Sequence, residues 1–164
     1  MDAPSLPADS ATAHVAVYQD VLQELSNTAR QLDGAFGAVL TGAVDLSGAH
    51  VRWDVTGFEG LTVIEDWDVF LEHVLTTCDE LWGQRGVGSK PAGLCFHQPG
   101  SQGHLQPPMA FVHLSLFNMP RQPLLVLDTQ ADALGAYTRP PNMKGQHESP
   151  DEPFENVPLS VVSA

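Results

Sequence analysis

The most regular alternation of apolar and polar residues lies at residues 111–117, which read FVHLSLF. Successive side chains of a β-strand point to opposite faces of its sheet, so this segment is predicted to be a strand with one wholly apolar face. The other face would carry His113 and Ser115 between two aromatic rings. A second apolar run follows at residues 124–127. We therefore predict that residues 111–117 form the central strand of a sheet.

Two other segments have apolar residues at alternating spacings of three and four, the spacing of an amphipathic helix. The first is residues 12–33, which end in the helix-terminating pair Asp33-Gly34. The second is residues 66–82, whose early acidic residues would complement the helix dipole. The apolar stripe of the first helix is interpreted as a core face. The alternative is that it mediates coiled-coil-like dimerisation.

Shorter apolar runs bounded by turn-forming residues predict the remaining strands. They lie at residues 36–46, 50–57, 61–64, 92–98 and 124–127, of which the first two form a hairpin around Ser47-Gly48. Residues 129–137 are predicted to form a short helix. The proline-rich and acidic residues 138–164 are predicted to be a largely disordered tail, although Phe154, Val157 and Leu159 could dock on the body.

These elements predict one α+β domain over residues 10–137, which is long enough to build its own core. In it, an antiparallel sheet of about five strands packs against two main helices, in the order α-β-β-α-β-β-β. This order resembles that of roadblock and longin-type modules, and also that of the small acidic chaperones of bacterial secretion systems. The resemblance lies in the order of elements alone, so it implies no functional residue.

The composition excludes several classes of partner. With 20 acidic and 7 basic residues the formal net charge is −13, and binding to a phosphate backbone needs clustered Lys and Arg. Nucleic acid is therefore not expected. Nor is a membrane, since no apolar run approaches the roughly 20 residues of a spanning helix. The first residues lack the basic and apolar regions of a secretory signal, which predicts a cytoplasmic protein.

The basic residues are distributed unevenly. No Asp or Glu lies between residues 81 and 127, whereas Arg85, Lys90 and Arg121 do. We predict that these three residues and His113 bind an anionic ligand or an acidic partner surface. His97, His104 and His113 would then strengthen the association on mild acidification. The alternative is that these bases are scattered in space and pair with carboxylates of other segments.

A second candidate site combines a thiol with imidazoles. If the strand of residues 92–98 paired with the strand of residues 111–117, Cys95, His97 and His113 would share a face, with His104 in the connecting loop. One thiolate and three imidazoles suit zinc or copper. The alternative is a half-buried face with scattered polar residues, because this spacing matches no known metal signature.

No motif points to catalysis. Gly83 and Gly88 have the spacing of a phosphate loop, but Ser89 precedes Lys90, the reverse of the required order. No G-x-S-x-G nucleophile motif is present. We therefore assign no catalytic residue and predict a non-enzymatic interaction or regulatory protein, adaptor- or chaperone-like, that binds a protein partner and forms a homodimer. The alternative is a small-molecule or metal-binding protein that uses the Cys95/His97/His104/His113 face, with residues 98–108 as a lid.

Overall fold

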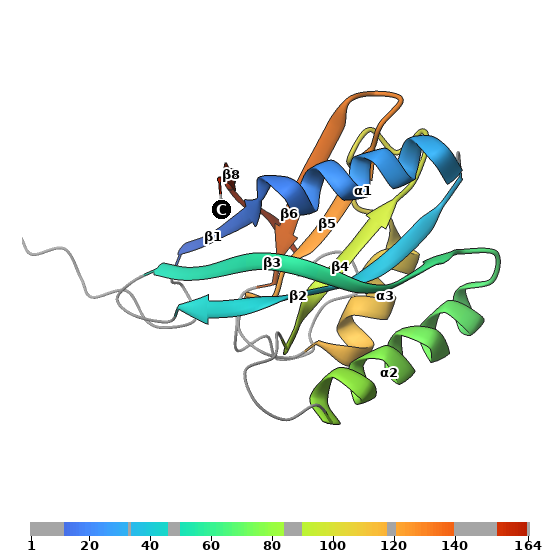
Figure 1. The fold of residues 1–164 in the computed structure, drawn as a ribbon, viewed down its shortest axis with the longest axis horizontal. Coiled ribbons are helices and arrows are strands. Elements are labelled where there is room, and N and C mark those ends of the chain that lie inside the picture. Colours follow the sequence, from blue (N-terminus) through green and yellow to red (C-terminus); the bar gives the residue numbers. More distant parts are fainter. Residues whose placement is uncertain are drawn as a thin grey trace, which may run out of the picture.

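The computed structural model describes residues 12–32, 34–45, 50–83, 90–117, 121–139 and 154–163. Within them the chain forms three helices and eight strands (Figure 1). The helices are α1 (Gln19–Leu32), α2 (Trp67–Gly83) and α3 (Pro107–Leu116). The strands are β1 (Thr12–Tyr18), β2 (Phe36–Asp45), β3 (His50–Val63), β4 (Lys90–His97), β5 (Leu124–Asp128), β6 (Ala133–Thr138), β7 (Glu155–Asn156) and β8 (Leu159–Val162). None of the described helices is both long and apolar enough to cross a membrane.

All eight strands belong to one mixed sheet in the order β7-β6-β5-β4-β2-β3-β1-β8. The pairs β1–β3, β1–β8 and β4–β5 are parallel, and the other pairs are antiparallel. A parallel pair needs a crossover connection, and α3 lies in the one between β4 and β5. The β2–β3 hairpin and α2 lie close to their predicted positions.

The sheet is curled so strongly that its two ends come close together. The N–H of Val157 donates to the carbonyl of Ala136 in β6 (2.9 Å), and the carbonyl of Pro158 accepts from the N–H of Val15 in β1 (3.1 Å). Consecutive Cα atoms are only about 3.8 Å apart. Two adjacent residues therefore connect strands that lie near opposite ends of the strand order.

The curl separates two hydrophobic cores. The inner core contains residues of β1 to β6 and the buried face of α1, including Val15, Leu25 and Trp53. The outer core lies between the sheet and the pair α2 and α3, and includes Phe70 and Phe96. Figure 1 shows α2 and α3 together on one side of the strands, with α1 apart from them. Side chains that alternate along β4 therefore enter different cores.

The predicted sheet of about five antiparallel strands with two main helices is wrong. Residues 111–117, predicted as its central strand, belong mostly to α3. Its first turn contains Pro107 and Pro108, which suit the start of a helix because the first N–H groups of a helix need no internal partner. Most residues of α3 are apolar, on its exposed as well as its buried side, so it lacks the polar face that marks an amphipathic helix. A short apolar run of this kind cannot be assigned from periodicity.

Three more segments differ from their predictions. Residues 12–18 form β1 rather than the start of the first helix, and residues 133–138 form β6 rather than a helix. Residues 154–163, which we name the C-terminal segment, were assigned to a disordered tail but contribute β7 and β8. Phe154, Val157 and Leu159 pack against the two cores, as the docking alternative predicted.

Candidate functional site

The four residues of the predicted metal site are not brought together. Cys95 belongs to the inner core, whereas His113 stacks on Phe117, a residue of the outer core on the other face of the sheet. His104 is exposed. Among the described residues, no group of three or more His, Cys, Asp or Glu could hold a metal ion. The separation follows from α3, because a helix replaces the strand that would have placed His113 beside Cys95.

Cys95 and His97 are both engaged in the protein interior. Burial raises the pKa of the Cys95 thiol to about 12, so the residue is a thiol at neutral pH. His97 Nδ1 donates to the carbonyl of Gly34 (2.8 Å), and His97 Nε2 lies 3.2 Å from the hydroxyl of Thr129. The ring also packs against Phe36. These contacts fix the C-terminal end of β4 within the fold.

The loop predicted to act as a lid, residues 98–108, is held by Asp128. Its carboxylate accepts N–H groups of Gly100 (3.0 Å) and Gln102 (2.9 Å), and also those of Gln130 and Ala131 in the turn before β6. Burial would raise the pKa of Asp128, but these four hydrogen bonds outweigh it and hold the pKa below its usual value. Asp128 is thus the anchor of this loop.

The residues predicted to bind an anion have separate surroundings. Lys90 Nζ donates to the carbonyl of Leu81 (3.4 Å) and lies 5.5 Å from the ring centre of Trp82. Arg121 is buried, and its Nη1 donates to Glu155 in the C-terminal segment (2.9 Å). Arg85 lies outside the described residues. The binding role of these residues stays a prediction.

His113, the fourth of that set, is buried between aromatic rings. It stacks on Phe117 at 5.0 Å between ring centres and meets the edge of Phe154 at 5.3 Å. Neither ring nitrogen has a hydrogen-bonding partner among the described residues. Burial, and then the charge of Arg139, lower the pKa of His113 to about 3, although the nearby backbone of Pro123 and Gln122 acts in the opposite direction.

This environment predicts acid sensitivity. The unfolded chain takes up a proton at His113 below about pH 6.5, whereas the folded chain does so only near pH 3. The contribution of His113 to stability is therefore complete above pH 6.5 and lost progressively as the pH falls toward 3. Between pH 7.5 and pH 5, His113 should lower the free energy of unfolding by on the order of 2 kcal/mol.

Denaturant titrations at pH 7.5 and pH 5 on the protein and on His113→Phe test this expectation. Phenylalanine keeps an aromatic ring between Phe117 and Phe154 but cannot titrate. The variant should therefore lose less stability than the parent protein over the same pH interval. Equal losses in the two proteins would show that His113 is not the titrating group.

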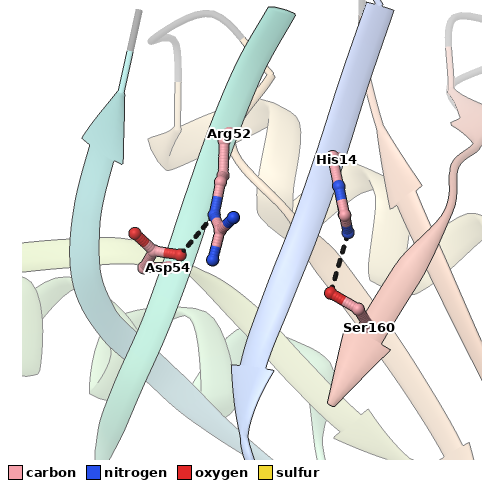
Figure 2. Close-up of polar contacts among 4 residues, drawn as sticks. All are labelled: His14, Arg52, Asp54 and Ser160. Carbon is pink, nitrogen blue, oxygen red and sulfur yellow. Dashed lines mark hydrogen bonds and ion pairs between the residues drawn. The ribbon is translucent and has the colours of Figure 1, made fainter. Parts of the chain in front are cut away.

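Polar side chains form a row across β3, β1 and β8 (Figure 2). Arg52 Nε donates to Asp54 Oδ1 (2.8 Å) on β3, and His14 Nε2 lies 2.8 Å from Ser160 Oγ between β1 and β8. Their neighbours along β3, including Trp53, point into the inner core. Among the described residues no carboxylate hydrogen-bonds to His14. The carboxylate of Asp54 is instead paired with Arg52. The row therefore lacks the carboxylate that orients a catalytic histidine and instead attaches β8 to β1.

A groove between α2 and α3 has a different character. It has a volume of about 180 Å³, and six of its eight lining residues are apolar. Its lining comes from α2, β4, α3 and the segment before β5: Leu75, Cys78, Asp79, Trp82, Pro91, Leu116, Phe117 and Gln122. Two of the large apolar side chains, Leu75 and Trp82, are 47% and 54% exposed. We name this hollow the α2–α3 groove.

The α2–α3 groove was not predicted from the sequence. Its signal was Leu75 and Trp82, which lie seven residues apart and so share a helix face with acidic residues. Large apolar residues on a charged face suit an interface better than a core. The second wall of the groove was not predictable while residues 111–117 were assigned to a strand.

The comparisons with known proteins identify the fold and no more. No protein-family model matches the chain, and no curated protein matches it. Among solved structures, the solution structure of protein DSY2949 from Desulfitobacterium hafniense matches with a TM-score of 0.55 and 12% identity. The match covers 92% of this chain and 94% of that one. The chain thus shares its fold with this protein, and fold alone does not specify function.

Proposed function

We propose that the protein is a non-enzymatic interaction module, adaptor- or chaperone-like, that binds a protein partner through the α2–α3 groove. The observation that carries the proposal is the exposure of Leu75 and Trp82 in a hollow that apolar residues of α2, β4 and α3 help to line. Tryptophan is among the residues that most often dominate the binding energy of an interface. Exposing two such side chains has no benefit for folding, whereas a partner that covers them gains apolar burial.

The titratable groups support a binding role over a catalytic one. Cys95 and His113 are buried, and His97 and Asp128 hold neighbouring backbone or side-chain groups. A cytoplasmic location and a homodimer, both expected from the sequence, remain part of the proposal. Sedimentation equilibrium of the purified protein tests the homodimer.

The function is tested by capturing partners from a lysate with three tagged proteins. They are the parent chain, the double variant Leu75→Ser/Trp82→Ser, and Val69→Ser. Val69 is a matched control because it is also an exposed apolar residue of α2 but does not line the groove. The double variant should bind a stoichiometric partner about thirtyfold more weakly, as expected for the loss of about 2 kcal/mol at a central contact. Val69→Ser should bind it normally.

The melting temperatures of all three proteins are measured first, to show that each is folded. Equal recovery of the same partner by the double variant and the parent chain would contradict a role for the groove. An equal loss of partner binding in the double variant and in Val69→Ser would also contradict a role for the groove.

A further inference from the structure

The solvent-facing side of α2 carries an ordered mixture of acidic and apolar residues. Spacings of four, three, four and three residues separate its members, so they lie on one stripe of the helix. They are Asp68, Glu72, Leu75, Asp79 and Trp82, and all five are exposed. We name this set the α2 stripe. Three of its members, Leu75, Asp79 and Trp82, also line the α2–α3 groove, so the carboxylate of Asp79 lies beside the two exposed apolar side chains.

No basic residue of α2 offsets this charge. The helix contains Asp68, Glu72, Asp79 and Glu80 but neither Lys nor Arg. Lys90 lies near Trp82, where it hydrogen-bonds to the carbonyl of Leu81. The approach to the groove along the rest of α2 is thus acidic, on a chain whose net charge is −13.

We propose that the occupant of the α2–α3 groove is a basic amphipathic helical segment of another protein. This inference rests on the proposed function and specifies its partner. Apolar side chains of the segment would pack on Leu75 and Trp82, and its Lys or Arg side chains would lie beside Asp79 and Glu72. An amphipathic helix presents both kinds of side chain at the spacing that the α2 stripe requires.

Charge also excludes the other simple occupant. A second copy of this chain would bring one acidic α2 against another, and like charges across an interface oppose association. A homodimer would therefore use another surface. A basic segment, in contrast, is attracted at long range, and its association should weaken as salt screens the charges.

The probe is a fluorescently labelled peptide of about 18 residues with Leu and Lys at amphipathic helical spacing, long enough to form a helix when bound. Fluorescence anisotropy measures its affinity for the full chain. A peptide with Glu in place of Lys and a scrambled Leu/Lys peptide are the controls. The ordered Leu/Lys peptide should bind at least tenfold more tightly than either control, and added salt should weaken it.

Adjacent residues of α2 provide the decisive pair of variants. Asp79 lines the α2–α3 groove, whereas Glu80 lines a different hollow on the other side of the helix, with His73 and Thr77. Asp79→Lys and Glu80→Lys change the net charge equally and lie at the same end of the same helix. Asp79→Lys should weaken peptide binding about tenfold, since it replaces an attraction with a repulsion. Glu80→Lys should weaken it by less than about twofold.

Equal weakening in the two variants, or equal binding of the scrambled peptide, would overturn the inference, because binding would then follow net charge alone. Failure of the ordered peptide to bind would overturn it too. If Leu75→Ser/Trp82→Ser still loses its lysate partner in that case, the proposed function stands and only the partner class is wrong. If the double variant keeps its lysate partner, the proposed function fails as well.

Discussion

Removal of residues 154–164 is expected to lower the free energy of unfolding by about 4 kcal/mol and the melting temperature by roughly 12 °C. The C-terminal segment supplies β7 on β6 and β8 on β1, at the two ends of the strand order. Its Val157 and Pro158 carry the backbone hydrogen bonds that join the ends of the curled sheet.

Two further losses add to this effect. Arg121 is buried and is paired with Glu155, so the deletion removes a carboxylate beside a guanidinium that has little access to water. Val157 and Leu159 pack against the inner core and Phe154 against the outer core, so both cores become more exposed. Each contribution is modest, but the deletion removes all of them together.

Thermal unfolding followed by circular dichroism measures the change. Removal of Ala164 alone is the control and should leave the melting temperature unaltered. The melting temperature of Glu155→Gln should lie between those of the two deletion variants, because this substitution weakens the contact with Arg121 but keeps both strands. A deletion variant that melts within about 2 °C of the parent protein would contradict the role assigned to the C-terminal segment.

Gly93→Ala is expected to destabilise the protein by about 3 kcal/mol, although it adds a single methyl group. Gly93 lies in β4 beside the backbone of Pro123, and a Cβ atom at this position would overlap the Pro123 carbonyl oxygen. The same oxygen accepts the N–H of Leu94 (3.1 Å), at the point where parallel β4 and β5 begin to pair. Backbone cannot move aside as a flexible side chain can, so the two strands must separate.

Chemical denaturation of Gly93→Ala and of Gly83→Ala distinguishes this steric effect from a general cost of replacing glycine. Gly83 ends α2, and no atom of the described residues lies close to the position of an added Cβ, so its replacement should change stability by less than about 0.5 kcal/mol. Similar stabilities for Gly93→Ala and the parent chain would mean that β4 and β5 approach less closely than described.

The parts of the fold that could be predicted are those with a long local signal. Helix α2 has an apolar stripe over its whole length and an acidic start, at which Asp66 accepts the N–H groups of Asp68 and Val69. The β2–β3 hairpin is formed by neighbours in sequence. In both cases the residues that decide the structure lie close together in the chain.

The remaining elements depend on contacts that the sequence does not display. Residues 12–18 contain Val15 and Val17, which fit the alternation of a strand and also the edge of the helical pattern that follows. The parallel partners of this segment, β3 and β8, decide between the two. Strands β7 and β8 are too short to show a strand pattern in the sequence. They form because they pair with β6 and β1. The α2–α3 groove requires the position of α3, for which the pair Pro107-Pro108 was the overlooked signal.

The position of β1 between β3 and β8 has a consequence for synthesis on the ribosome. His14 and Ser160, which join β1 to β8, are 146 residues apart in the chain. During translation β1 can pair with β3 early, but its other edge has no partner until the C-terminal segment leaves the exit tunnel. The nascent chain therefore carries an open strand edge until β8 has been made and pairs with β1.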